Sequence, residues 1–346
     1  PPRSTLSSSS AASDVYKRQG HAYTSVATDF IARFMRLKGH DVRFQTGTDE
    51  HGLKIQKAAE SKGKEPLELC DENSRIFRDL TTTLDLSNDD FIRTTEQRHI
   101  DGASFLWNRL HERNQIYLGE YTGWYSINDE TFYNEKDLVK QSDGSFKTVT
   151  GGPVDWITEK SYFFKLSEWS DKLLELYEKN PDFISPRSKR NEVIKFVESG
   201  LNDLSVSRTS FNWGIKTPTD NDHIMYVWLD ALTCYANGVN YLTESENGLS
   251  DYWNNVVHIV GKDILRHHAV YWPAFLLAAD LKLPNKIFAH GWWTNEGNKI
   301  SKSLGNVIDP IEIINNYGLD QFRYFLLREV PFGNDGDFSV KALVNR

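Results

Sequence analysis

Apolar residues recur at helical spacing from residue 24 onward, after a Ser-rich beginning that shows no periodicity. The apolar positions of this predicted first helix are Val26, Phe30, Phe34 and Leu37, and Gly39 lies just past its end. Residues 41–46 then predict a strand, which leads into a glycine-rich corner at residues 47–52 and a helix to about residue 62. Further helices are predicted at about residues 66–85 and 96–114. This order is typical of a parallel α/β sheet with helices on its faces.

The pattern changes between about residues 116 and 215, where short strands and polar turns are mixed with two amphipathic helices. The strands are expected at residues 117–127, 131–133 and 146–149, and the helices at residues 167–179 and 188–200. The α/β pattern then returns, with strands at residues 256–260 and 286–289 around a helix at about residues 263–279. The chain therefore predicts an α/β domain interrupted by an α+β insertion.

Composition supports a folded chain with a large core. The 346 residues are 39% hydrophobic and 13% aromatic, and they include ten tryptophans. The net charge of -8 argues against broad, non-specific binding of nucleic acid, although it leaves room for a local basic site. No apolar stretch approaches the length of a membrane span.

The cysteines limit the metal and redox chemistry. Cys70 and Cys234 are the only two, and they lie far apart in the sequence. Without a C-x-x-C pair, we expect neither a zinc knuckle nor a disulfide framework. A reducing compartment such as the cytosol is consistent with this.

The segment GNKISKSLGN at residues 297–306 carries the clearest chemical signal. Lys299 and Lys302 supply positive charge, and Ser301 supplies a hydroxyl donor between nearby glycines that permit close backbone approach. Such a loop can surround phosphates. Taken alone, its alternative interpretation is a solvated polar loop, which we favour less.

Two glycine corners at the expected sheet edge also suggest ligand binding. Gly20 and His21 are predicted at the start of the first helix, where free N–H groups and the helix dipole favour anions. Asp49 and its neighbours Glu50 and His51 follow a strand, where ligands of open α/β sheets bind. A carboxylate there can pair with an amine or a ribose hydroxyl, whereas the alternative is an ordinary helix cap. Consecutive residues rarely ligate one metal, so we expect none here.

A stripe of apolar residues and a third corner complete the candidate site. Trp228, Ala231, Leu232 and Tyr235 recur at helical spacing, which indicates either core packing or the wall of an apolar pocket. Gly261 and Asp263 follow a second predicted strand. Ile264 and His268 share a helical face four residues apart.

Together these motifs resemble those of the methionyl-tRNA synthetase family of class I aminoacyl-tRNA synthetases, over about residues 20–346. The matching segments are GTDEHG at 47–52, EKSYFFKLS at 159–167, LSVSRTSFNWGI at 204–215, YVWLDA at 226–231, GKDILRHHAVYWPAF at 261–275 and HGWWTNEGNKISKSLGN at 290–306. Gly20-His21 is similar to the end of the family's His-Ile-Gly-His signature, and KISKS to its ATP-binding loop.

The resemblance implies a Rossmann-like catalytic core with a connective insertion. The implied divisions are a non-native or disordered leader at 1–17, catalytic halves at 18–115 and 221–297, an acceptor-end insertion at 116–220, and a signature-loop and stem-contact region at 298–346. The chain departs from the family in four ways. Arg18-Gln19 replaces His-Ile, the central strand expected before Gly20 is replaced by residues 1–17, and zinc ligands and the anticodon-binding domain are missing.

The family activity is the ATP-dependent joining of methionine to the 3′ end of tRNA(Met). By resemblance, Lys302, Lys299 and His21 would act in catalysis, and the ATP site would comprise Gly20, His21, Gly261, Asp263, Lys299, Ser301 and Lys302. The methionine site would comprise Asp49, Trp228, Ala231, Leu232, Tyr235, Ile264 and His268.

The resemblance further implies ATP with Mg²⁺, no zinc, no membrane, a monomer, and a location in the cytoplasm or an organellar matrix. Two alternatives stay open at this point. One is a class I synthetase for another apolar amino acid such as leucine, isoleucine or valine. The other is a catalytically impaired fragment that binds a nucleotide or tRNA, a hypothesis that the altered first signature favours.

Overall fold

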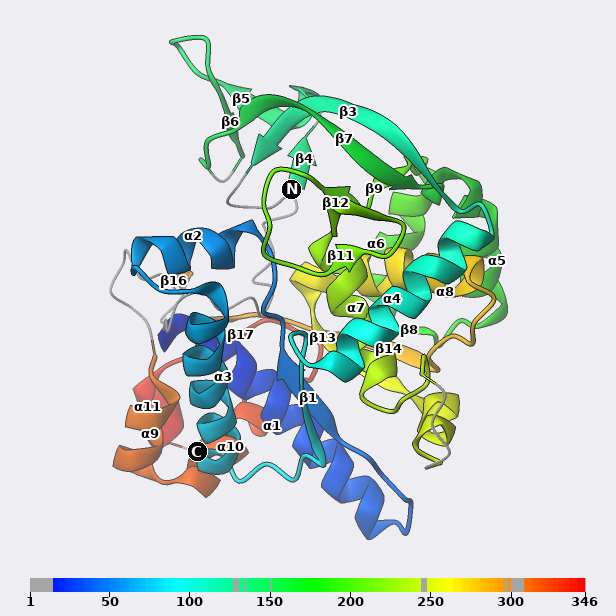
Figure 1. Cartoon of the computed structure of the whole chain (residues 1–346). Helices are drawn as coiled ribbons and strands as arrows, with labels where there is room; N and C mark the ends of the chain where they lie inside the picture. Colours follow the sequence, from blue (N-terminus) through cyan, green and yellow to red (C-terminus); the bar gives the residue numbers. More distant parts are fainter. Residues whose placement is uncertain are drawn as a thin grey trace.

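The computed structural model describes residues 15–126, 131–133, 135–149, 151–243, 248–295, 298–299 and 308–345 (Figure 1). Two groups of parallel strands form its centre. β1 (Gln45–Thr48) pairs with β2 (Asp90–Arg93), and β13 (Val257–Gly261) pairs with β14 (Lys286–His290). The predicted α/β arrangement is therefore confirmed for both halves of the sheet.

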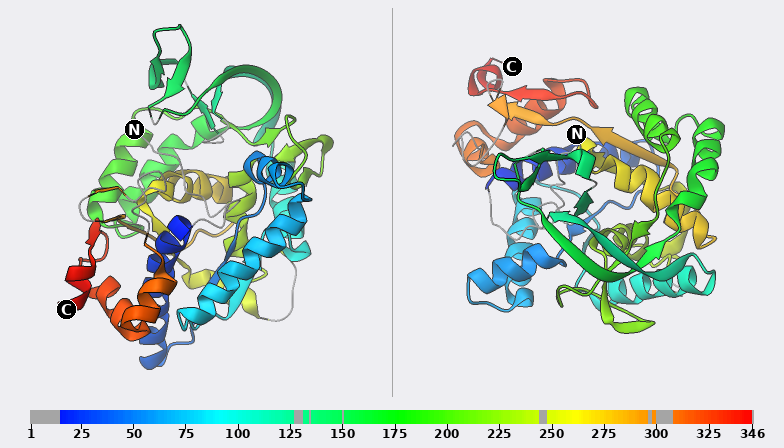
Figure 2. Two further views of the ribbon diagram at one scale, coloured as in Figure 1. Left: turned by 90° about the vertical axis from the view of Figure 1, so that its left-hand side faces the viewer. Right: turned by 90° about the horizontal axis from the view of Figure 1, so that it is seen from above.

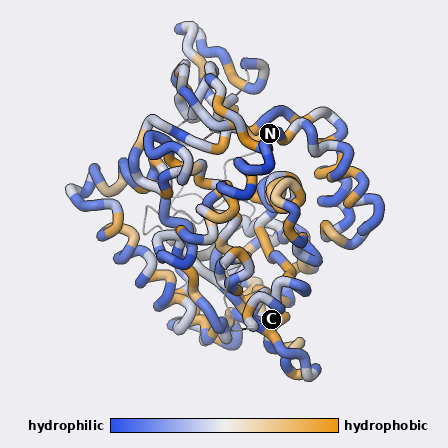
Figure 3. The backbone as a smooth tube through the Cα atoms, turned by 45° about the vertical axis from the view of Figure 1, so that its right-hand side comes forward, coloured by the Kyte–Doolittle hydropathy of each residue, from blue (hydrophilic) through white to orange (hydrophobic). Residues whose placement is uncertain are grey.

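Helices flank these strands. They are α1 (Val15–Leu37), α2 (Leu53–Ser61), α3 (Pro66–Thr83), α4 (Gln97–Glu112), α7 (Val227–Asn237) and α8 (Trp272–Ala278). Of these, α2, α3 and α4 lie close to where the hydrophobic pattern predicts them. Figure 3 shows hydrophobic and hydrophilic stretches alternating along the helices, as expected where one face of each helix packs into the core. The largest core contains Trp107 of α4, Leu232 of α7 and Phe275 of α8. None of the described helices combines the length and apolar character needed to cross a bilayer.

The region between α4 and α7 is dominated by an antiparallel sheet in the order β4-β3-β7-β9. Its two long strands, β3 (Ile116–Ser126) and β7 (Asp155–Phe164), form a curved ribbon over the top of the molecule in Figure 1. The other two are β4 (Thr131–Tyr133) and β9 (Leu204–Ser205). The hairpin of β5 (Leu138–Lys140) and β6 (Phe146–Thr148) projects beside them, and β10 (Ser207–Arg208), β12 (Asp220–Met225) and β11 (Lys216–Thr217) form a smaller sheet. The strand β7 was not predicted from the sequence pattern.

Part of the range predicted as an insertion contributes to the core around the parallel strands. β8 (Ile184–Ser185) pairs in parallel with β14, and the neighbouring helices are α5 (Ser170–Lys179) and α6 (Arg187–Glu198). Tyr177 of α5 donates its hydroxyl hydrogen to the Ala269 carbonyl at 2.6 Å. The predicted domain boundaries remain a proposal, and residues 170–198 pack with the main core.

A C-terminal group of helices packs against α1 in both views of Figure 2. It comprises α9 (Pro310–Tyr317), α10 (Leu319–Arg328) and α11 (Val340–Val344), with β15 (Trp293–Asn295), β16 (Asn298–Lys299) and β17 (Gly336–Phe338) alongside. Fully buried Asp29 of α1 accepts hydrogen bonds from Arg323 of α10, from Arg33 and from Ser87. These bonds join α1 to α10 and to the loop before β2, and they lower the pKa of Asp29 even though burial opposes its ionisation.

Two predicted elements have different bounds in the structure. The strand expected at 41–46 begins only at Gln45, because the Phe44 backbone exchanges hydrogen bonds with Asp89 instead. The helix expected at 263–279 is divided into a 3₁₀ turn (Lys262–Ile264), a π-helical turn (His267–Tyr271) and α8. Pro273 accounts for the π-helical turn, since proline has no N–H to donate to the carbonyl four residues earlier and its ring clashes with that carbonyl.

Candidate functional site

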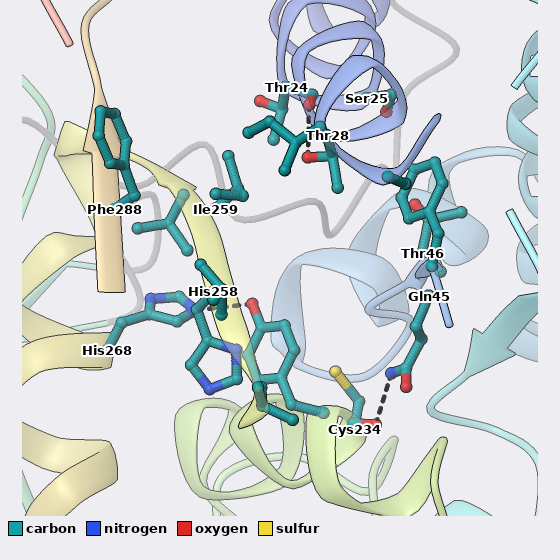
Figure 4. A pocket seen from close by; sticks show the side chains of 18 of the residues that line it. Thr24, Ser25, Thr28, Gln45, Thr46, Cys234, His258, Ile259, His268 and Phe288 are labelled. Carbon is teal, nitrogen blue, oxygen red and sulfur yellow. Dashed lines mark hydrogen bonds between the residues drawn. The ribbon is translucent and has the colours of Figure 1, made fainter. Parts of the chain in front are cut away.

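A cavity of about 1470 Å³ lies between β1 and β13, with α1 on one face and α7 on the other. Figure 4 shows Thr24 and Thr28 of α1 above it, Cys234 of α7 below it, and Gln45 and His258 on opposite sides. Within the described part of the chain, β1 and β13 each pair on one side only, and no strand lies between them. The cavity thus occupies the level of the sheet where a central strand is expected from the sequence.

The three ionisable residues of the first corner have three different surroundings. Asp49 lines the cavity. Glu50 forms a bidentate ion pair with Arg93, at 2.8 Å to Nε and 2.9 Å to Nη2. It also accepts hydrogen bonds from the Thr48 and Thr95 hydroxyls. His51 bonds to Asp230 instead. Of the three, only Asp49 lines the large cavity. Among the described residues, no cluster of three or more His, Cys, Asp or Glu side chains suits a metal.

α7 provides an apolar wall of the cavity, which favours the binding interpretation of its stripe over core packing alone. Trp228, Ala231, Leu232 and Tyr235 all line the cavity, together with Ile264 and His268. The Trp228 ring stacks on His267 with ring centroids 3.7 Å apart. This stack orients the indole at the edge of the cavity.

Hydrogen bonds determine the tautomer of His268. Its Nδ1–H donates to the Ile264 carbonyl at 2.8 Å, so its Nε2 accepts from the Tyr235 hydroxyl at 2.6 Å. Burial lowers the pKa of His268 to about 4, and the bond to Ile264 offsets only part of this shift. The ring is therefore neutral at physiological pH, and this part of the cavity suits an uncharged ligand group.

A buried carboxylate lies on the opposite side of the same helix. Asp230 is fully buried, and its two oxygens accept from His51 Nδ1 and His99 Nε2, each at 2.6 Å. Burial opposes the ionisation of Asp230, but the two histidines outweigh that effect and bring its pKa down to about 2. This network was not predicted, because nothing in the sequence shows that residues 51, 99 and 230 meet.

The third corner, after β13, contributes a polar end to the cavity. Gly261 and Asp263 line it, and Trp292 donates its indole N–H to Asp263 at 3.1 Å. Lys262 forms an ion pair with Asp335 at 2.6 Å and lies over the Trp292 ring, 4.3 Å from its centroid. Trp292 and Asp335 were not predicted as site residues, although Trp292 lies in the quoted segment at 290–306.

His290 connects this end of the cavity to α1. Its Nδ1–H donates to the Gly291 carbonyl at 2.8 Å, and its Nε2 accepts from the Thr24 hydroxyl at 2.7 Å. Burial lowers the pKa of His290. This bond holds the middle of α1 against the carboxyl end of β14.

The predicted position of Gly20 and His21 at a helix start is wrong. α1 begins at Val15, so Gly20 lies beyond the first four residues, whose N–H groups are free in a helix. An anion site made by the Gly20 N–H at a helix N-terminus therefore has no support. His21 nevertheless lines the cavity, with its ring packed edge-on to Phe77, and its contact with ATP stays a prediction.

The lysine loop is only partly covered by the structure. The Lys299 backbone pairs with Thr294 in the β15–β16 hairpin. Ser301 and Lys302 lie outside the described residues, as does the Lys299 side chain. Their roles remain predictions.

Comparison with known proteins identifies what the chain is similar to. The family model for tRNA synthetases class I (M) matches residues 16–145 and 144–346. The chain is 59% identical to methionine--tRNA ligase of Rickettsia conorii over 94% of its own length, and 53% identical to that of Rhizobium meliloti over the same share. It covers 63% of each of these relatives, slightly less than two thirds of their length.

A solved structure shows the same similarity. Mycobacterium tuberculosis methionyl-tRNA synthetase in complex with methionyl-adenylate matches this structure with a TM-score of 0.91 and 52% sequence identity. The match covers 95% of this chain and 64% of that one. The predicted class I catalytic-core fold is confirmed by this similarity.

Proposed function

The chain belongs to the methionyl-tRNA synthetases of class I, and from that premise we propose that it activates methionine with ATP and transfers it to tRNA(Met). One observation carries the proposal. A single cavity contains a carboxylate, an apolar aromatic wall and a polar corner at the end of a parallel strand. These are the groups needed for the ammonium and thioether of methionine and for the adenosine of ATP.

The methionine end combines charge with an apolar surface. We propose that Asp49 pairs with the substrate ammonium, while the thioether packs against Trp228, Tyr235, Ala231, Leu232 and Ile264. Sulfur packs favourably against aromatic rings. Neutral His268, held by Tyr235, would keep this wall uncharged.

The ATP end would be formed by residues from several segments. We propose that Gly261 and Asp263 hold adenosine, and that Trp292 keeps Asp263 in place. His21, which lines the cavity, would contribute from α1. Lys299, Ser301 and Lys302 would bind the phosphates of the leaving pyrophosphate. Mg²⁺ would arrive with ATP, bound mainly by its phosphates.

The proposed chemistry requires no protein nucleophile. A methionine carboxylate oxygen bonds to the α-phosphorus of ATP while the bond to pyrophosphate breaks, giving methionyl-adenylate. The terminal ribose hydroxyl of tRNA then attacks the methionyl carbonyl carbon, loses its proton and releases AMP. The protein contributes by positioning the substrates and by stabilising the charge that develops on phosphate, chiefly through Lys302.

Further parts of the proposal follow from this activity. The antiparallel sheet within the predicted insertion at 116–220 would accommodate the tRNA acceptor end, between catalytic halves at 18–115 and 221–297. Residues 298–346 would provide the signature loop and stem contact. We propose that the enzyme needs no zinc, works as a monomer, and acts in the cytoplasm or in an organellar matrix, where proteins are synthesised.

Amino-acid-dependent exchange of pyrophosphate into ATP tests the proposal. Methionine should support exchange, and leucine, isoleucine and valine should each be weaker by about tenfold or more, the separation that an apolar pocket gives near-isosteres. Exchange driven equally by leucine would favour a synthetase for another apolar amino acid. No exchange, combined with retained ATP or tRNA binding, would favour a non-catalytic binding protein.

A further inference from the structure

The two halves of the proposed methionine site come from different segments of the chain. Asp49 lies in the corner after β1, whereas Trp228, Ala231 and Tyr235 lie on α7. Affinity for one small substrate requires a fixed distance between the carboxylate and the apolar wall. Some interaction must therefore hold α7 against the corner.

Asp230 joins these two segments. It lies on α7 between two cavity-lining residues, Trp228 and Ala231, but is not itself part of the cavity lining. Its Oδ2 accepts from His51, two residues after Asp49, at 2.6 Å. Its Oδ1 accepts from His99 of α4, also at 2.6 Å. Hydrogen bonds to a buried, charged acceptor are the strong ones, so both contacts define positions closely.

A second close contact between α4 and α7 lies about two helical turns after Asp230. Asn237 donates to the His99 carbonyl at 3.0 Å and lies 3.2 Å from His99 Nδ1. An added Cβ at Gly102 would lie 1.8 Å from Asn237 Oδ1, so only glycine permits this approach. The amide N–H at Nδ1 indicates that His99 carries its hydrogen on Nε2, the atom that donates to Asp230.

We propose that Asp230 is a positioning residue that sets the distance between Asp49 and the apolar wall, and thereby determines methionine affinity. This inference rests on the proposed function. Asp230 does not line the cavity, and it acts through His51 and α7. It should therefore affect methionine binding and leave ATP binding, at the β13 end of the cavity, largely unchanged.

The decisive variant is Asp230→Asn, which preserves shape but removes the charge and one acceptor. The readout is methionine-dependent pyrophosphate exchange, with KM measured separately for methionine and for ATP. We expect the KM for methionine to rise by about ten- to a hundredfold, the usual cost of misplacing a binding group. The KM for ATP should stay within about twofold. Asp29→Asn is the matched control, since Asp29 is also fully buried and ion-paired, but with Arg33 and Arg323.

A second pair of variants tests the same role if Asp230→Asn does not fold. His51→Asn retains an N–H near the position of Nδ1, whereas His51→Leu does not. The asparagine variant should keep a methionine KM several-fold lower than the leucine variant, with equal KM values for ATP.

The outcomes distinguish failure of the positioning role of Asp230 from failure of the proposed function. Any of three results would overturn the positioning role while leaving the proposed function intact. They are an unchanged KM for methionine in Asp230→Asn, equal rises in its KM values for methionine and ATP, and the same rise in the methionine KM of Asp29→Asn. Absence of methionine-dependent exchange in the unmodified protein would overturn the proposed function itself, and this inference with it.

Discussion

Replacement of His268 by asparagine should make the fold less sensitive to acid. His268 is buried beside the cavity, and its folded-state pKa is about 4, below the usual value of 6.5. Between these values the unfolded chain takes up a proton at this ring and the folded chain does not, so stability falls as pH decreases from 6.5 towards 4. Integrated to pH 5, this single group costs about 2 kcal/mol, whereas near pH 8 it costs almost nothing.

Asparagine can still donate to the Ile264 carbonyl but does not titrate. Urea unfolding should therefore show that the free energy lost between about pH 8 and pH 5 is about 2 kcal/mol smaller in His268→Asn than in the unmodified protein. Some pH dependence will persist, because burial also lowers the pKa values of His258 and His267. His111→Asn, at an exposed position of α4, is the control for the change of residue type. Equal losses in the unmodified protein and in His268→Asn would refute the argument.

Three further predictions concern the proposed site. Lys302→Ala should reduce methionine-dependent exchange by about a hundredfold, the usual effect of removing one charge-stabilising donor, and a change within about threefold would contradict the role of Lys302. Asp49→Asn should raise the KM for methionine, whereas Glu50→Gln should mainly lower the melting temperature, because Glu50 is paired with Arg93; the reverse result would show that the two carboxylates have been assigned wrongly. Replacing residues 1–19 with an apolar strand followed by His-Ile should raise both the melting temperature and the rate of exchange. The reason is that β1 and β13 each have one edge without a partner among the described strands. Equal melting temperatures and equal exchange rates in the two proteins would show that the sequence of residues 1–19 does not matter.

The sequence predicted much of the secondary structure because hydrophobic period is a local property. Helices such as α3 and α4, and the parallel strands β13 and β14, lie close to their expected positions. The corners after β1 and β13 were also predictable, because ligand crevices of parallel sheets lie at the carboxyl ends of strands. Both corners line one cavity.

Other features needed the tertiary structure because they depend on partners distant in sequence. The sequence could not distinguish the roles of Asp49, Glu50 and His51, which are set by residues as remote as Arg93 and Asp230. The upstream extension of α1 to Val15 was equally invisible, since residues 15–19, VYKRQ, are too short and too polar to show an apolar helical period.

The contrast within α7 shows the same division. The spacing of Trp228, Ala231 and Tyr235 identified one helical face, but a core helix has the same spacing as a pocket wall. Only the packed structure shows that this face borders a cavity, while Asp230 on the opposite side is enclosed by two histidines from other segments. Periodicity determines which residues share a face, whereas the fold decides what that face meets.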